Sequence, residues 1–264
     1  RDQRLSRGLG DVYKRQSQYC QIQQRIEAQN LHAVENFRQP MTFSFWVRSN
    51  KTGNYSFTLQ QNDNSNRQMP GQYTINAANT WEKKIITVPA DSSGLVNDDS
   101  GIGLILTWGL AYGSNYTSGS VATNNAFKAY SSSDFGAGQG VNLLDSTDNE
   151  WYLTGVQLEV GTQATPFEHR NFGDELARCQ RYYQQYTGVA NRIYVQNVYR
   201  VQHPLPVQMR ATPTFTKSYG YSTGLQTDNT AADTDTLNWD LQYTNAGTGI
   251  IDILSGTLTL DAEL

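Results

Sequence analysis

The feature that most constrains the fold of this chain is a period-two alternation of apolar residues in its first half. Residues at every second position of a strand share one face. A turn sequence at 51–54 follows the alternating run, and alternation resumes beyond it, which predicts a β-hairpin. The first alternating positions are Met41, Phe43, Phe45 and Val47.

Similar strand-like segments recur along the chain, separated by turns rich in Asn, Asp, Ser and Gly. We therefore predict a mainly β fold: an antiparallel jelly-roll β-sandwich, then one short α-helix and a C-terminal β region. The expected divisions are 17–170 for the sandwich, 171–188 for the linking helix and 189–264 for the C-terminal β region.

The segment 1–16, RDQRLSRGLGDVYKRQ, differs from the rest because it is basic and shows no sustained period. Its string LSRGLGDVYKRQ resembles translated sequencing-adapter read-through at the ends of metagenomic contigs. On that interpretation the segment is not native and the natural chain extends upstream. The alternative is a basic, disordered tail, and either way the segment is excluded from fold reasoning.

The predicted helix covers Gly173–Tyr186. Apolar side chains fall there at helical spacing, and Gly188 is placed to end the helix. Adjacent residues of a helix point about 100° apart, so one of the paired tyrosines can face a second domain or a neighbouring subunit. We expect a domain or subunit interface here, with ordinary core and hinge packing as the alternative. The expected interface residues are Leu176, Tyr182, Tyr183 and Tyr186.

The composition of the chain limits the classes of partner that it is expected to bind. Charged residues are 17% of the chain and the net charge is −4, so a nucleic-acid partner is not expected. The longest apolar run, Ile102–Leu106, is too short to cross a bilayer, so no membrane insertion is expected. Aromatic residues are 11%, which argues against disorder. Cys20 and Cys179 are the only cysteines; we interpret them as two buried free thiols, with a disulfide as the alternative.

Catalytic motifs are absent from the sequence. The three histidines have no zinc-binding spacing, and no nucleophile elbow, Walker loop or dinucleotide fingerprint occurs, so we expect no enzyme and no cofactor. A loop with three acidic residues before the last sandwich strand leaves a glycan depolymerase as the less favoured alternative. Those residues are Asp145, Asp148 and Glu150. A structural Ca²⁺ would draw on Asp98, Asp99, Asp145 and Asp148.

Aromatic residues are stronger candidates for a functional site than the acidic residues, because sugar rings stack on exposed Trp and Tyr faces. Trp108, Tyr112 and Tyr116 lie at a strand end and in the adjoining loop, where they suit a glycan-binding platform; a variable surface loop with no partner is the alternative. Trp81 and Trp151 begin strands and are interpreted as packing residues at the ends of the sandwich. A sixth aromatic residue falls between the core positions of its strand and points the other way, toward an exposed face or a second layer. It is Trp46.

The segment Trp151–Tyr183 carries a family resemblance. It reads WYLTGVQLEVGTQATPFEHRNFGDELARCQRYY, in which TGVQLEVG leads through AT-x-FE into ELARCQRYY. This resembles a recurrent junction in bacteriophage tail-fibre and virion structural proteins, where it follows the last strand of a jelly roll like that of carbohydrate-binding modules. The later LPVQMRATPTF and strands upstream resemble the same group, so the resemblance covers about 20–215.

The resemblance implies a phage tail-fibre or tail-associated structural protein, made in the host cytoplasm and incorporated into the virion. Its implied partners are further copies of itself in a homotrimer, other tail proteins and a host-surface polysaccharide. It supplies no catalytic motif. A dedicated carbohydrate-binding, receptor-recognition module stays open as the alternative, because fold does not determine function.

Overall fold

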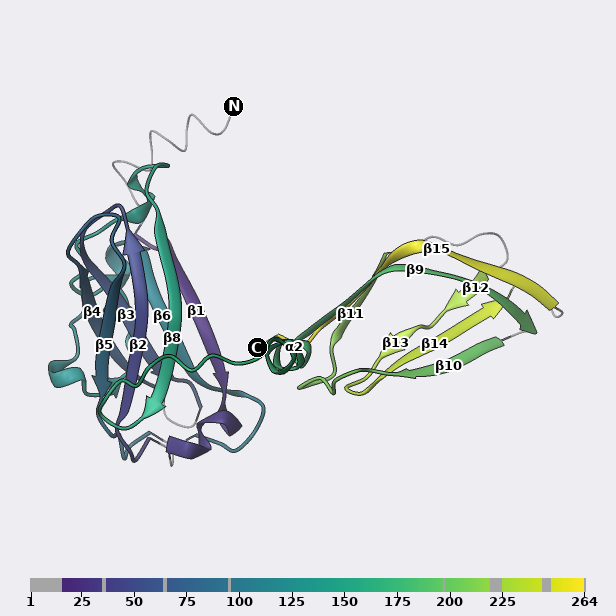
Figure 1. The fold of residues 1–264 in the computed structure, drawn as a ribbon, viewed down its shortest axis with the longest axis horizontal. Helices are drawn as coiled ribbons and strands as arrows, with labels where there is room; N and C mark the ends of the chain where they lie inside the picture. The colour runs from purple at the N-terminus through teal and green to yellow at the C-terminus, as the bar shows by residue number, and fades with distance from the viewer. Residues whose placement is uncertain are drawn as a thin grey trace. The chain divides into compact units, whose positions relative to one another are not determined.

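A computed structural model describes residues 16–34, 37–63, 66–94, 96–196, 198–218, 225–243 and 248–263. The chain divides into two compact units, 1–168 and 169–264, each described by itself below (Figure 1). The sequence placed this division after residue 170. The prediction for the basic segment falls on 1–15, which lie outside the described residues, and on residue 16.

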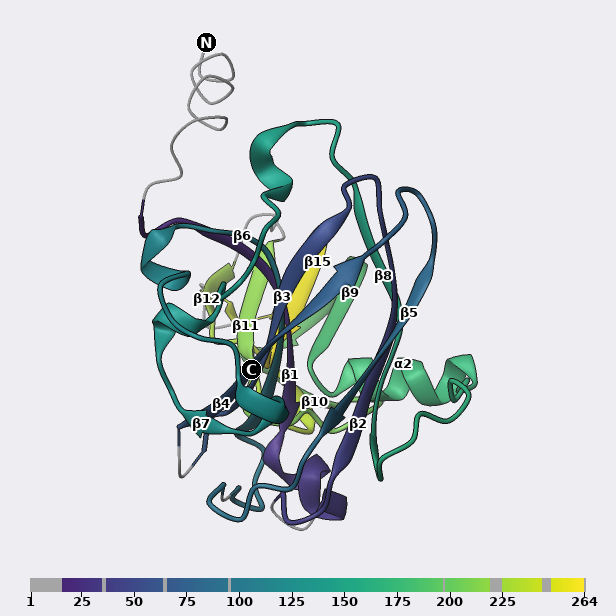
Figure 2. The same cartoon turned by 90° about the vertical axis from the view of Figure 1, so that its left-hand side faces the viewer.

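The first unit is a sandwich of two antiparallel sheets, seen as two layers in Figure 2. The larger sheet consists, in spatial order, of β1 (Tyr19–Glu27), β6 (Ile102–Tyr112), β3 (Gly53–Gln61), β4 (Arg67–Ile75) and β7 (Lys128–Ala129). The smaller sheet consists of β5 (Glu82–Val88), β2 (Met41–Ser49) and β8 (Trp151–Val160). The predicted mainly β, antiparallel architecture is confirmed, while the jelly-roll connectivity stays a prediction.

One aromatic-rich core joins the two sheets. The Phe43 ring centroid of β2 lies 5.5 Å from that of Trp108 in β6, and the Phe45 centroid lies 5.8 Å from it in an edge-on arrangement. The alternating positions predicted from sequence are the inward face of β2, and all of them are at most 1% exposed. Burial of such rings is the main favourable contribution to folding of this unit.

The long connection from β6 to β8 covers the outer face of the larger sheet. The Ser56 hydroxyl of β3 donates to the Gln139 side-chain oxygen at 2.6 Å, and the Gln72 amide of β4 donates to the Ala137 carbonyl at 3.0 Å. Buried polar side chains on this face therefore find partners in the connection. The connection contains the 3-10 turns η2 (Ser114–Tyr116), η3 (Thr123–Asn125), η4 (Ser132–Asp134) and η5 (Leu143–Asp145).

The second unit contains two further antiparallel sheets and the helix α2 (Phe172–Gln180). One sheet consists of β11 (Thr214–Ser218), β15 (Thr248–Asp261) and β9 (Tyr183–Gln196). The other consists of β10 (Val198–Pro204), β14 (Thr236–Tyr243) and β12 (Leu225–Asp228), with β13 (Ala231–Ala232) also paired to β14. The described core of this unit centres on Met209, Leu260 and Ala262.

The helix is shorter than predicted. It begins after Asn171, whose side chain accepts a hydrogen bond from the Asp174 N–H at 2.9 Å and so caps the first turn. It ends at Gln180. Tyr182 lies in the turn that follows, whereas Tyr183 and Tyr186 belong to β9, where Tyr186 pairs with Leu258 of β15. Pairing with a long neighbouring strand overrides the helical spacing of these aromatic residues, which also favour strands. Gly188, expected to end the helix, lies within β9.

Removing one ring from the aromatic core should destabilise the first unit strongly. We expect Phe43→Ala to lower the free energy of unfolding by about 3–5 kcal/mol, because a cavity replaces the ring. Chemical denaturation followed by tryptophan fluorescence checks this, since Trp108 is in contact with Phe43. Ile85→Ala is the control: Ile85 is 55% exposed and should change the value by less than about 1 kcal/mol. Equal losses for the two variants would contradict the prediction.

Candidate functional site

The outer face of the smaller sheet carries exposed aromatic side chains. Alternation along β2 places Phe45 and Val47 in the core, and the Trp46 side chain between them on the opposite face. Trp46 is 40% exposed although β2 is the central strand of its sheet. The outer face of this sheet therefore leaves a large ring of its central strand open to solvent.

Two further rings lie at the same end of this face. Trp81, just before β5, and Tyr152 of β8 have ring centroids 6.4 Å apart, and each is more than 40% exposed. Arg48 of β2 pairs with Tyr152 across the strands, and its guanidinium carbon lies 5.5 Å from the Tyr152 ring centroid. A cation at this distance is attracted to the ring face, which holds both side chains in place.

A β-bulge makes room beside Trp46. The register between β2 and β8 shifts between Ser44 and Trp46, and Gly155 of β8 has a φ of +58°. A Cβ at position 155 would lie 3.1 Å from Trp46 Cδ1 and 3.9 Å from Phe167 Cδ2. Glycine therefore permits both the left-handed backbone and the close approach of the indole.

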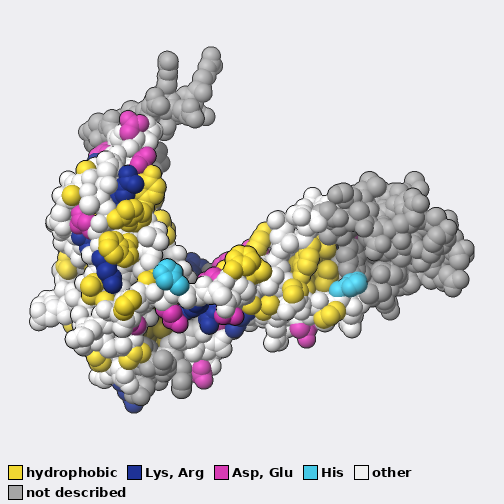
Figure 3. Space-filling view, viewed as in Figure 1, with side chains coloured by type: hydrophobic (Ala, Val, Ile, Leu, Met, Phe, Trp, Pro, Cys, Tyr) yellow, Lys and Arg dark blue, Asp and Glu magenta, His cyan; other side chains and the backbone are white. Residues whose placement is uncertain are grey.

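We call this surface the aromatic face. Each of its four aromatic side chains is between 40% and 43% exposed. Figure 3 shows hydrophobic side chains with Lys and Arg side chains among them over β5, β2 and β8. Contiguous exposed apolar groups of this kind mark interaction sites more often than single exposed residues do. The members of the aromatic face are Trp46, Trp81, Tyr152 and Phe167.

A carboxylate holds the turn that presents Trp81. Glu82 accepts hydrogen bonds from the backbone N–H groups of Asn76 and Ala77 at 2.8 and 2.9 Å, and from the Lys84 ammonium at 2.6 Å. Burial alone would raise the pKa of Glu82, but these hydrogen bonds outweigh it and lower the pKa to about 2. Glu82 is therefore ionised at neutral pH and fixes the β4–β5 connection beside the aromatic face.

The residues predicted for glycan binding do not form one exposed platform. Trp108 is 1% exposed and belongs to the core, so the expectation of an exposed ring is wrong for it: it shares the inward face of β6 with Leu104 and Leu106. Tyr112 is 5% exposed. Burial raises the pKa of Tyr112, whose hydroxyl donates to the Gln21 side-chain oxygen at 2.7 Å.

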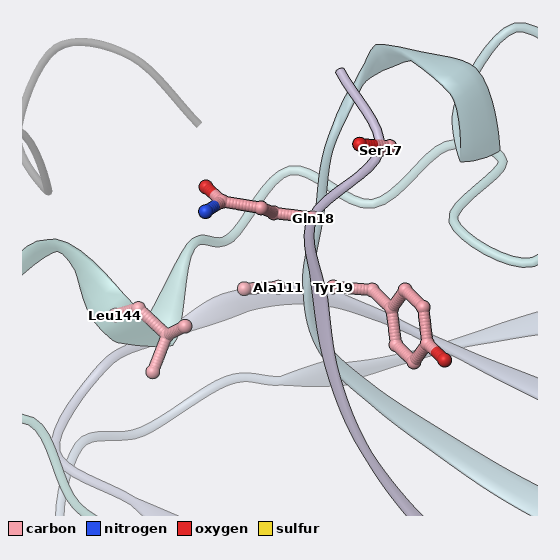
Figure 4. Close-up of a pocket in the computed structure, with 5 residues that line it drawn as sticks. All are labelled: Ser17, Gln18, Tyr19, Ala111 and Leu144. Carbon is pink, nitrogen blue, oxygen red and sulfur yellow. The ribbon is translucent and has the colours of Figure 1, made fainter. Parts of the chain in front are cut away.

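Tyr116 does belong to an aromatic cluster. It is half-buried in η2, and its ring packs edge-on against Tyr19 of β1 with centroids 5.2 Å apart. Tyr19 is 55% exposed, and sequence reasoning did not single it out. A pocket of about 440 Å³ adjoins it, lined by Ser17, Gln18, Tyr19, Ala111 and Leu144; in Figure 4 the Gln18 and Tyr19 side chains point to opposite sides of the strand.

The predicted interface residues of the second unit are partly exposed. Leu176 is 43% and Tyr183 is 41% exposed, and Tyr182 is half-buried. Tyr186 packs against the core of its own unit. Only Leu176 lies within α2; the three tyrosines follow it, so they do not share a helical stripe with it.

The candidate Ca²⁺ ligands lie at opposite ends of the sandwich. The Asp99 carbonyl accepts from the Gln29 N–H, near the start of β2, whereas Asp145 forms an ion pair with Lys51, beyond the end of β2. Within the described residues, no three His, Cys, Asp or Glu side chains come close enough to share a metal ion. The remaining candidate donors are Asp98 and Asp148, both exposed.

Both cysteines are free thiols. Cys20 is half-buried, whereas Cys179 is exposed, so the expectation that both are buried is wrong for Cys179. The interpretation of Trp151 as a packing residue is confirmed, because it packs against the core and its indole N–H donates to the Tyr73 hydroxyl at 3.2 Å. The same interpretation of Trp81 is wrong.

None of the helices among the described residues combines the length and apolar character that a membrane crossing requires. A scan against protein-family models gave no match, and neither did searches of curated proteins and of solved structures. The functional reading of this chain therefore depends on its own residues and their geometry.

The Glu82 contacts predict an acid-dependent stability. Its pKa is lower in the folded protein than in the unfolded chain, where about 4.3 is typical. The stabilisation by the ionised group is thus complete above about pH 5 and is lost as the pH falls toward 2. Denaturation midpoints of the wild type and of Glu82→Gln, measured from pH 6 to pH 2, should converge at the acidic end. A constant gap between them would contradict this role.

Proposed function

We propose that this chain is a non-enzymatic structural protein of a bacteriophage tail, in a tail fibre or associated with it, and that its first unit contacts glycans on the host surface through the aromatic face. The exposed rings of Trp46 and Tyr152 on one sheet, with Trp81 directly before its strand β5, carry this proposal. The assignment to a phage tail rests on the resemblance of the segment that joins the two units to a junction in bacteriophage tail-fibre proteins.

The geometry suits a sugar chain. The C–H faces of a pyranose ring pack on aromatic rings, and such contacts need rings that solvent can reach and that do not collapse onto each other. The sheet fixes the spacing of Trp46 and Tyr152, since both belong to paired strands. Trp81 is held by the turn around Glu82. A preorganised platform of this kind binds without a large entropic cost of ordering its side chains.

Two of the three acidic residues that left a glycan depolymerase as an alternative, Asp145 and Glu150, have carboxylates engaged in structural contacts. Asp145 pairs with Lys51 and accepts from the Asn149 amide at 2.6 Å. Glu150 accepts from the Tyr152 hydroxyl at 3.0 Å. These contacts favour a binding role over glycan cleavage for this part of the molecule.

Self-association through the second unit completes the proposal. Phe172 is 80% exposed and Leu176 is 43% exposed, and they lie four residues apart on one side of α2. No described residue of α2 is buried. A homotrimer, as expected for a tail fibre, would cover this apolar side. The chain would be made in the host cytoplasm and join other tail proteins in the virion.

Loss of aromatic rings should weaken attachment. We expect Trp46→Ala combined with Tyr152→Ala to reduce glycan or host-cell binding by about tenfold or more, since each stacked ring contributes roughly 0.5–1.5 kcal/mol beyond its buried area. A glycan array and a cell-adsorption assay with the purified chain measure this.

The matched control is Tyr19→Ala combined with Tyr116→Ala, which removes two rings from the other aromatic cluster of the same unit. Its binding should stay within about twofold of the wild type. Unchanged binding by the Trp46 and Tyr152 variant, with loss in the control, would move the proposed site to the Tyr19 cluster. Unchanged binding by both variants would remove glycan contact from the proposal.

Polar substitution on α2 should dissociate the assembly. We expect Phe172→Ser combined with Leu176→Ser to shift the protein from trimer toward monomer in light scattering at micromolar concentration, because the variant removes two exposed apolar contacts. Glu175→Gln, on the same helix but polar, is the control and should keep the oligomeric state. A wild-type monomer would contradict the proposed trimer.

A further inference from the structure

Arg48 is a guanidinium held in place without an acceptor. Its side chain is half-buried beside the Tyr152 ring, and no hydrogen bond or ion pair joins it to another described residue. Its Nε atom is buried and has no hydrogen-bond partner. A buried donor left unsatisfied costs about 1–3 kcal/mol, and Arg normally meets carboxylates or carbonyls in such positions.

A second cation lies one row along the sheet. Lys83 of β5 is exposed and stands directly across from Trp46 of β2. Opposite residues of an antiparallel pair have Cβ atoms about 4.5–5.5 Å apart, so the ammonium can reach a group bound on the indole. Like Arg48, Lys83 has no carboxylate partner within ion-pair distance among the described residues.

The carboxylates of Glu159 and Glu150 border this face, and both accept hydrogen bonds from neighbouring side chains. Glu159 accepts from the Thr165 hydroxyl at 2.6 Å and from the Thr165 N–H at 2.9 Å, while Glu150 accepts from Tyr152. Neither forms an ion pair with a cation of this face. Hydrogen bonds from Thr165 and, less strongly, the nearby Lys83 ammonium lower the pKa of Glu159, so the charge of Lys83 is partly compensated. The face thus combines stacking rings with Arg48, which has no ion-pair partner among the described residues, and with the partly compensated Lys83.

We infer that the aromatic face binds an acidic polysaccharide, with the sugar rings stacked on Trp46 and Trp81 and a uronic-acid carboxylate paired with Arg48. This inference rests on the proposed glycan-binding function and names its ligand class. Arg presents a planar pair of donors that matches the two oxygens of a carboxylate. Lys83 supplies a second, less directional contact to the next charged sugar.

The alternative polyanion is nucleic acid, and the observations favour the polysaccharide. Nucleic-acid binding needs an extended basic surface that neutralises several phosphates. This chain has a net charge of −4, and the described part of the aromatic face offers two cations, Arg48 and Lys83. Single-stranded DNA is therefore included in the test as a probe that should not bind.

The experiment uses the full chain and a pair of polymers that differ only in charge. Calorimetry or biolayer interferometry measures binding to polygalacturonate and to the same polymer with its carboxyl groups methyl-esterified. Alginate and hyaluronan test other uronic-acid polymers, and dextran sulfate separates carboxylate recognition from general anion binding. Circular dichroism verifies that each variant is folded.

We expect the wild type to bind at least one uronic-acid polymer at least tenfold more tightly than the esterified polymer, dextran sulfate or single-stranded DNA. Arg48→Gln should lower the affinity about tenfold and Lys83→Gln about threefold, as expected for lost charge-assisted contacts. Arg38→Gln makes the same charge change at an exposed position before β2 and should have no effect. Binding should weaken as the salt concentration rises.

Several results would overturn the inference. Equal binding of the charged and esterified polymers would overturn it, and so would an unchanged affinity in Arg48→Gln. In either case the proposed glycan-binding function stands if Trp46→Ala still abolishes binding. Equal or tighter binding of dextran sulfate or single-stranded DNA would assign the cations to another anion. Failure of all three uronic-acid polymers would also overturn the inference, and the absence of any glycan binding on the array would remove the proposed function with it.

Discussion

The contact between Phe43 and Phe45 of β2 and Trp108 of β6 is the interaction on which the first unit depends. It joins the two sheets over a common core and fixes which side of β2 faces inward. Because side chains alternate, the same contact forces Trp46 outward. Removal of the inner rings would therefore disturb the outer surface as well, since one strand supplies both.

Sequence reasoning predicted the sandwich because alternation is a local property that burial on one face leaves in the chain. It overestimated the helix, because Tyr183 and Tyr186 have the spacing of a helical stripe and also the β propensity of tyrosine. The deciding factor was pairing with β15, which follows more than sixty residues later. No window around the tyrosines contains that information.

Part of the candidate site could be predicted from the sequence. Alternation alone indicated that Trp46 points away from the core, but not whether a second layer covers it. Coverage depends on where the long β6–β8 connection lies, and it lies on the other sheet. The burial of Trp108 could have been predicted, because it continues the every-second-residue pattern of Leu104 and Leu106. Its position beside a tyrosine-containing loop was the misleading signal.

Because β2 supplies both the core rings and the exposed Trp46, substitutions in this strand affect the interior and the outer surface together. A shift of one residue in its pairing would exchange interior and exterior, and would put Phe43 and Phe45 into water. New specificities are therefore easier to reach through the flanking strands, at positions such as Lys83 and Tyr152, than through β2 itself. The central strand β2 is constrained by the core, whereas outward residues of its neighbours β5 and β8 can change without disturbing it.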